Sequence, residues 1–149
     1  GIANGELVRN GSLLEYHDGT SSRVLVNRDL AETLTNKTLT SPTLTFSINS
    51  QTGTTYTPVL ADTGKIITCS NGSAITFTIP PNSSVAYPIG SSLTVISIGA
   101  GLTTIGQGAG VTIASTGAVA TAPVLRIQHS SATAIKIATD TWQVVGDIS

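Results

Sequence analysis

Residues 33–45 read Thr-Leu-Thr-Asn-Lys-Thr-Leu-Thr-Ser-Pro-Thr-Leu-Thr, which is three copies of Thr-Leu-Thr set five residues apart. A five-residue period fits neither an α-helix, whose apolar residues recur at i, i+3, i+4 and i+7, nor a strand, in which they alternate. Thr is β-branched and favours an extended backbone, and Pro42 moves Ser41 away from helical dihedral angles. One leucine per five residues cannot form a core of its own. We therefore expect this segment to become ordered only against sister chains or a partner surface.

The alternative for this stretch is a Thr-rich linker, because a Ser/Thr/Pro composition often accompanies the lack of a packed core. The regular leucines and the absence of glycine between positions 20 and 52 argue against a slack tether. Before the repeat, Asp18-Gly19 lies between two apolar patches and predicts a small hairpin. After it, residues 44–48 alternate and predict a strand. We place a domain boundary in the polar segment 51–55, so that residues 1–50 form an extended N-terminal arm and residues 51–149 a separate domain.

Composition favours an all-β fold. Of the 149 residues, 40% are hydrophobic but only 4% aromatic and 10% charged, with many glycines, which is typical of short strands and tight turns. The net charge of −1 leaves no basic patch for nucleic acid. Residues 1–65 hold eleven charged side chains and residues 66–149 hold four. Since soluble surfaces are usually about 25–35% charged, we expect the C-terminal part to cover much of itself with copies of itself.

Short strands recur from Tyr56 onward. Residues 75–79 (Ile-Thr-Phe-Thr-Ile) alternate fully, and Asn71-Gly72 before them is a strong hairpin signal. Eight or nine such strands predict a compact β-sandwich or jelly-roll-like domain. The residues expected to point inward are Ile67, Ile75, Phe77, Ile79, Leu93, Val95, Ile98, Ile105, Ile113, Leu125, Ile127, Ile135, Ile137, Trp142 and Val144.

Several catalytic and ligand-binding patterns fit this sequence poorly. Asp62-Thr63-Gly64 matches the catalytic turn of aspartic proteases, but that chemistry needs two close carboxylates, and an ordinary β-turn explains the triplet better. The glycines between 99 and 110 lack the following helix of a dinucleotide loop. His17 and His129 stand far apart in the sequence, without ligands at zinc spacing. Cys69 is alone, and no apolar run is long enough to span a membrane. We predict a protein that is not an enzyme and needs no cofactor or metal.

Two parts of the chain resemble bacteriophage structural proteins. Residues 34–42 (Leu-Thr-Asn-Lys-Thr-Leu-Thr-Ser-Pro) are similar to a segment that recurs in tail-fibre and other virion proteins. Residues 56–147 look like a β-domain found at the end of many such proteins. Its marks are Leu60-Ala61-Asp62-Thr63-Gly64-Lys65, Ile79-Pro80-Pro81-Asn82-Ser83-Ser84, Tyr87-Pro88-Ile89-Gly90-Ser91 and Thr141-Trp142-Gln143-Val144-Val145-Gly146-Asp147.

Read as a small complete protein, the chain is then expected to be a capsid decoration (cement) protein. The resemblance implies a homotrimer on the outer capsid surface, assembled in the bacterial cytoplasm, whose arm reaches across the major capsid protein without contacting nucleic acid or membrane. The alternative is a tail-fibre or receptor-binding tip, in which loops near Tyr87 and Trp142 contact host glycan. In the first reading the partner interface consists of the large apolar residues of the arm: Leu7, Leu13, Leu25, Leu34, Leu39, Leu44 and Phe46.

Overall fold

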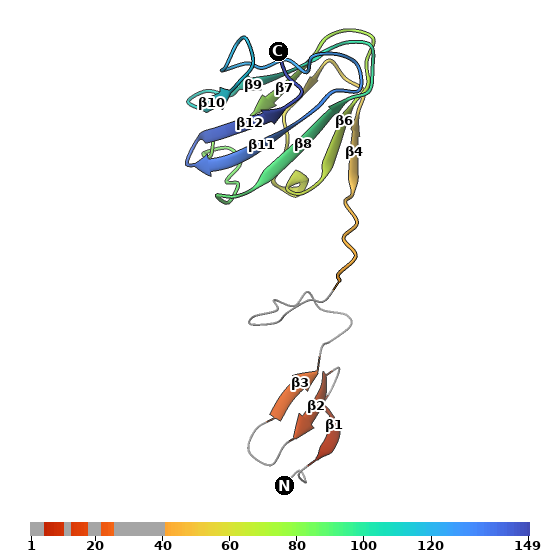
Figure 1. Ribbon diagram of the computed structural model, residues 1–149. Helices are drawn as coiled ribbons and strands as arrows, with labels where there is room; N and C mark the ends of the chain where they lie inside the picture. Colours follow the sequence, from red (N-terminus) through yellow and green to blue (C-terminus); the bar gives the residue numbers. More distant parts are fainter. Residues whose placement is uncertain (1–4, 11–12, 18–21, 26–40) are drawn as a thin grey trace. The chain divides into compact units, whose positions relative to one another are not determined.

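The computed structural model describes residues 5–10, 13–17, 22–25 and 41–149 (Figure 1). They belong to two compact units, Gly1–Thr43 and Leu44–Ser149. Nearly all the regular structure is strand, which confirms the predicted all-β class. The exception among the described residues is one turn of 3-10 helix, η1 (Leu60–Asp62).

The N-terminal unit contains a three-stranded antiparallel sheet, made of β1 (Glu6–Asn10), β2 (Leu13–His17) and β3 (Ser22–Leu25). β2 and β3 pair with Leu14 opposite Leu25, which is the hairpin predicted around Asp18-Gly19. β1 pairs with the other side of β2. The described residues of this unit therefore form a three-stranded antiparallel sheet, whereas the sequence predicted an extended arm.

The pentad repeat lies largely outside the described residues, which resume at Ser41. From there the chain is free of regular structure until β4 (Ile48–Gln51), so the strand expected over residues 44–48 begins only at its last residue. β4 pairs in parallel with β6 along its whole length. Because of this pairing, β4 belongs to the C-terminal unit, and the boundary falls at Thr43–Leu44 instead of in residues 51–55.

The C-terminal unit consists of two sheets that enclose one core (Figure 1). The smaller sheet has the order β5-β7-β9, from β5 (Thr55–Tyr56), β7 (Ile75–Ile79) and β9 (Thr103–Gln107). The larger sheet has the order β10-β12-β11-β8-β6-β4. Its further strands are β6 (Ile66–Cys69), β8 (Ser92–Ser97), β10 (Thr112–Ser115), β11 (Ser131–Ala138) and β12 (Thr141–Gly146).

The first six strands of this unit build three stacked coils. The chain crosses from the larger to the smaller sheet in β4–β5, again in β6–β7 and again in β8–β9. Each strand pairs in parallel with its counterpart in the preceding coil. In the larger sheet Ile48 is aligned with Ile66, and Ile66 with Thr94. After the coils, β11 and β12 form an antiparallel hairpin, in which β11 pairs with β8 and β12 with β10.

This topology corrects two sequence predictions. The prediction of a hairpin at Asn71-Gly72 is wrong, because the turn there links β6 in one sheet to β7 in the other. The facing sheets are sandwich-like, but parallel pairs within both of them differ from the antiparallel Greek keys of a jelly roll. An Asn-Gly turn favours a reversal of the chain. Here the reversed chain enters the opposite sheet and does not pair with the strand before it.

Glycines allow the turns of successive coils to lie directly on each other. The Gly101 N–H donates to the Asn71 carbonyl (2.9 Å), and the Gly99 N–H donates to the Cys69 carbonyl (3.1 Å). A Cβ on Gly101 would lie 1.9 Å from the Ser73 carbonyl oxygen, and one on Gly99 2.3 Å from the Asn71 nitrogen. These glycines therefore serve close backbone packing.

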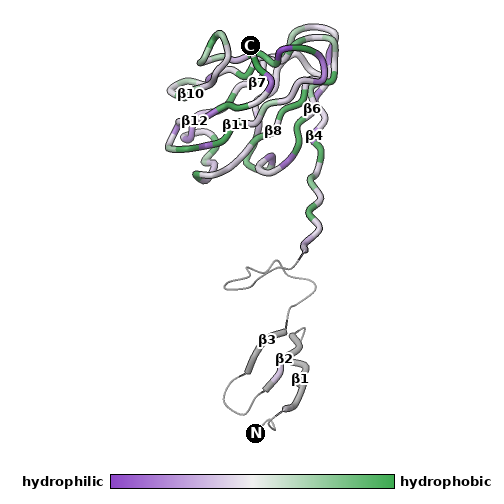
Figure 2. The backbone as a smooth tube through the Cα atoms, viewed as in Figure 1, coloured by the Kyte–Doolittle hydropathy of each residue, from purple (hydrophilic) through white to green (hydrophobic). Residues whose placement is uncertain are grey.

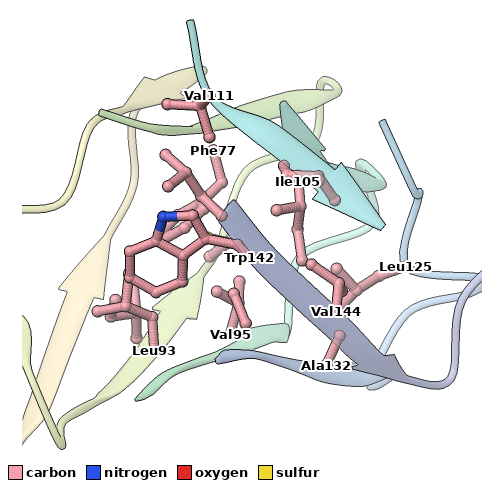
Figure 3. Close-up of a cluster of buried hydrophobic side chains, with 14 of the residues drawn as sticks. Phe77, Leu93, Val95, Ile105, Val111, Leu125, Ala132, Trp142 and Val144 are labelled. Atoms are coloured by element: carbon pink, nitrogen blue, oxygen red, sulfur yellow. The ribbon is translucent and has the colours of Figure 1, made fainter. Parts of the chain in front are cut away.

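The core is made mainly of aliphatic side chains around Phe77 and Trp142 (Figure 3). Trp142 is 1% exposed and packs edge-on against Tyr87, with ring centroids 5.5 Å apart. Most of the predicted inward residues are buried: Ile67, Ile75, Phe77, Ile79, Leu93, Val95, Ile105, Ile113, Leu125, Trp142 and Val144.

Four predicted core residues are not buried. Ile98, Ile127 and Ile137 are exposed, and Ile135 is half-buried. In β11 the inward positions are instead Ala132, Ala134 and Lys136. The side chains predicted to point inward, Ile135 and Ile137, therefore point outward, and the residues between and before them point inward. Small alanines face the core here because the Trp142 strand, β12, lies next to β11.

Candidate interaction surface

The outer face of the six-stranded sheet carries no charged side chain. The six strands contain one charged residue, Lys136, and it lies on the inner face. The strand register instead aligns one row of aliphatic and hydroxyl side chains across five strands: Ile48, Ile66, Thr94, Thr133 and Val145.

Aliphatic residues on this face are open to solvent in the single chain. Ile48 is 64% exposed and Val145 is 47% exposed. Between them, the Thr94 and Thr133 hydroxyls lie 3.1 Å apart and bond to each other. We name this surface, defined by the row above together with Ile96, Ile135 and Ile137, the uncharged sheet face. Interface cores are depleted of charged residues in the same way.

The segment that leads into β4 is also apolar and exposed. Leu44 is 74% exposed and Phe46 is 57% exposed, and hydrophobic positions continue below β4 in Figure 2. Phe46 borders a shallow hollow of about 240 Å³ at the edge of the uncharged sheet face. Its other lining residues are Gly64, Lys65, Ile66, Ser92 and Thr94.

Two of the seven residues predicted to contact a partner can therefore be assessed, and both Leu44 and Phe46 are exposed. Leu7, Leu13 and Leu25 lie on β1, β2 and β3, but the structure does not describe their side chains. Leu34 and Leu39 lie outside the described residues. The uncharged sheet face was not among the predicted site residues. The sequence feature that could have indicated this face is the near absence of charged residues in the six strands.

Asp62 is the centre of a buried polar network beside the first coil. The residue is 1% exposed. It accepts hydrogen bonds from the Tyr56 hydroxyl (2.6 Å), the Asn49 amide (2.9 Å) and the Val59 backbone N–H (2.9 Å), and the Lys65 ammonium lies 3.6 Å away. Burial by itself would raise the Asp62 pKa, but these hydrogen bonds and the Lys65 charge outweigh it and lower the pKa. Burial and the bond to Asp62 raise the pKa of Tyr56 to about 12.

This geometry gives Asp62 a structural task. An aspartic protease needs a second carboxylate that shares a proton with the first, whereas the groups that contact Asp62 are hydrogen-bond donors or a cation. Because Asp62 is buried, a second chain cannot bring its own carboxylate alongside. The network also explains why β4, an edge strand, turns Asn49 and Gln51 inward: the Gln51 amide donates to Asn49 (2.6 Å), which in turn donates to Asp62.

The aromatic rings proposed for glycan stacking are inaccessible. Tyr87 is 3% exposed and Trp142 is 1% exposed, so neither offers a face to a sugar. The Tyr87 hydroxyl is used within the chain, where it donates to the Val59 carbonyl (2.6 Å). The exposed aromatic residues are Tyr16 and Phe46.

Other chemical features are sparse. Arg126 and Asp147 form an exposed ion pair at 2.6 Å, in which hydrogen bonding raises the pKa of the arginine and lowers that of the carboxyl. Among the described residues, no group of three or more His, Cys, Asp or Glu side chains could hold a metal ion. Within the same residues, no helix is both long and apolar enough to cross a membrane.

Comparison with known proteins gives no family assignment: no protein-family model matches the sequence, and no curated protein is significantly similar to it.

Proposed function

We propose that this protein is a structural component of a bacteriophage particle and acts by adhesion without catalysis. In this proposal, the C-terminal units of three chains associate, and the residues before β4 bind the major capsid protein on the outside of the shell. The assignment to a phage comes from the sequence resemblance of residues 34–42 and 56–147. The observation that carries the adhesive role is the uncharged sheet face, together with the exposed Leu44 and Phe46 next to it.

The physical argument for self-association starts from this face. Copies of one chain that pack around a threefold axis bring this surface close to its equivalents in the neighbouring copies, and these repel each other when the surface carries a net charge; this one carries none. Burying exposed aliphatic area stabilises an assembly by about 25 cal/mol per Å². Closed association can also protect β4, one of the two edge strands of the larger sheet. A cyclic trimer satisfies both requirements with a single kind of contact.

The argument for the shell contact concerns the segment before β4. Leu44 is the last leucine of the pentad repeat, and it is followed two residues later by Phe46. Both side chains are mainly exposed, so they are available to a groove on another protein. A trimer presents three such segments, and their contacts add at a high effective concentration.

Variants at the two surfaces test the two contacts separately. Val145→Glu places a charge in the uncharged sheet face, and we expect it to convert the trimer to monomer in light scattering coupled to gel filtration. Val119→Glu is the matched control, because Val119 is 55% exposed but lies outside the strands. If Val145→Glu and Val119→Glu both keep the particle mass of the starting protein, the sheet face is not the interface.

The double variant Leu44→Ser/Phe46→Ser tests the shell contact. We expect it to remain trimeric and to lose most of its co-sedimentation with undecorated heads of the parent phage. Cryo-electron microscopy of intact particles should show the protein over the capsid. Density at the tail together with binding to host cells would support the fibre tip instead, although the buried Tyr87 and Trp142 remove the stacking platform suggested for it.

A further inference from the structure

Lys136 is a buried lysine with an unusual set of partners. It lies on the inner face of β11 and is 3% exposed. Its Nζ donates to the Asn82 side-chain Oδ1 (2.5 Å) and to the Tyr87 carbonyl (2.7 Å). In the part of the chain that the structure describes, the ion pairs are Lys65–Asp62 and Arg126–Asp147, and Lys136 takes part in neither. A primary amine is therefore held against neutral oxygen atoms in the interior.

This arrangement is costly while the nitrogen stays an ammonium. A buried charge without an opposite charge is strongly destabilising. Buried lysines usually persist because they are paired, or because they take part in chemistry that uses the amine. Here the side chain in contact is a carboxamide, which a primary amine can attack.

Both reacting groups are fixed by further hydrogen bonds. The Asn82 backbone N–H donates to the Asp140 Oδ1 (2.5 Å). The Lys136 backbone bonds to the far end of the same loop, with its N–H on the Ser91 carbonyl (2.9 Å) and its carbonyl accepting from the Gly90 N–H (2.8 Å). The two side chains therefore meet between segments that are held by backbone hydrogen bonds.

The core side of the site is shielded from water, whereas Asn82 itself is half-buried. Trp142 lies directly opposite Lys136 in the β11–β12 register, and Tyr87 packs edge-on against Trp142. Both rings are almost fully buried. Because a C=O bond is about 1.2 Å long, the Asn82 Cγ lies no further than about 3.7 Å from the Lys136 Nζ. This is close to the separation of about 3–3.5 Å from which positioned groups react.

We propose that Lys136 and Asn82 join covalently through an amide bond between Nζ and Cγ. The free amine attacks Cγ and forms a tetrahedral intermediate, the bond from Cγ to the Asn82 amide nitrogen breaks, and that nitrogen leaves as ammonia. The proton that the lysine ammonium loses ends on the released ammonia, so an ammonium and a carboxamide become a substituted amide and an ammonium ion. No oxidant, reductant or cofactor takes part. Asp140 is a positioning residue, since it holds the Asn82 backbone and contacts neither reacting atom.

The bond would connect the loop between β7 and β8 to β11, far apart in the sequence, and would remove the buried charge. It would also fix the position of the loop that carries Tyr87, whose ring packs against Trp142. This inference is independent of the proposed role in a phage particle, because the reaction takes place within one chain and needs no assembly.

Intact-mass spectrometry of the purified full chain tests it. Loss of one ammonia lowers the mass by about 17 Da relative to the sequence, and digestion should yield one branched peptide that joins the segments around Asn82 and Lys136. Asn82→Ala and Lys136→Met should each have the full mass of their sequences. Asp140→Ala should form the bond more slowly when the mass is followed with time after refolding.

The starting protein is the decisive sample, so the result does not depend on whether a variant folds. A chain with native Trp142 fluorescence that keeps its full sequence mass after prolonged incubation overturns the proposal. A loss of the same mass that persists in Asn82→Ala also overturns it, because the ammonia would then come from another site.

Discussion

Replacing Asp62 by Asn tests whether the buried carboxylate stabilises the first coil. Asp62 accepts three hydrogen bonds, from Tyr56, Asn49 and Val59. An asparagine of the same shape keeps one acceptor oxygen and places an NH₂ group where the second was. If the remaining oxygen serves Tyr56 and Val59, the new NH₂ faces the Asn49 amide, and donor meets donor. Asn49 cannot simply turn over, because its own oxygen already accepts from Gln51.

The free energy of unfolding should fall by the contribution of one charge-assisted hydrogen bond and by the cost of leaving one buried donor unsatisfied. This amounts to about 3 kcal/mol of the free energy of unfolding at pH 7, or a fall of roughly 10 °C in the midpoint of thermal unfolding. Trp142 is the only tryptophan and is buried, so its fluorescence during urea denaturation measures this loss directly. Asp147→Asn is the matched control: the Asp147 side chain is 42% exposed and accepts from Arg126 and the Ser130 hydroxyl, so its loss of stability should be smaller than that of Asp62→Asn.

The pH dependence adds a second check. The Asp62 pKa is lower in the folded chain than in the unfolded chain, so its stabilising effect is complete above the unfolded value of about 3.9 and declines as the pH falls through the folded value. The difference in stability between the starting protein and Asp62→Asn should therefore be constant from pH 7 to about pH 5 and shrink in stronger acid. Equal stability of the two proteins at pH 7 would refute the reasoning, as would a gap that widens in acid.

Two further predictions concern other parts of the C-terminal unit. Gly101→Ala should lower the free energy of unfolding by about 3 kcal/mol, because the added Cβ would lie 1.9 Å from the Ser73 oxygen, whereas Gly72→Ala meets nothing within 4 Å and should be almost neutral; equal urea midpoints for the pair would show that the stacked turns can separate freely. Cys69 is 0% exposed and burial raises the pKa of its thiol, so a thiol reagent should modify it slowly in the native chain and rapidly in denaturant; rapid labelling at neutral pH without denaturant would contradict the buried position.

The sequence predicts the individual strands well and their pairing poorly. Phe77 and its two isoleucine neighbours alternate with threonine, and a strand with one buried face is the only structure that uses this pattern fully. The pattern does not say whether a neighbouring strand runs parallel or antiparallel, and Asn71-Gly72 favours the wrong choice. In β11, isoleucine outweighs alanine on any hydropathy scale, yet Ala132 and Ala134 face the core. Their small size fits beside Trp142, and only the three-dimensional arrangement provides that information.

The candidate surfaces were partly predictable for a similar reason. Leu44 could be identified as exposed from the repeat, because regularly spaced apolar residues without a core of their own are not buried within the segment, and the exposed Phe46 follows two residues later. The uncharged sheet face could not be located, since it depends on which side of each strand points outward. The Asp62 network was read from Asp62-Thr63-Gly64 as a turn, but Asn49 and Tyr56 reach that carboxylate through the stacking of the first two coils, which the residue order does not reveal.

The closing hairpin has a consequence for synthesis on the ribosome. β12 provides Trp142 and Val144 to a core whose other walls, from β6 to β9, are translated earlier. While the chain grows, those aliphatic walls stay uncovered until residues 141–146 have left the exit tunnel, since translation proceeds from the N-terminus at about 5–20 residues per second. The coils can pair in the order in which they are made, but the nascent chain keeps an open hydrophobic side until β12 docks. Chaperone binding should therefore be strongest just before β12 emerges and should end when the hairpin docks.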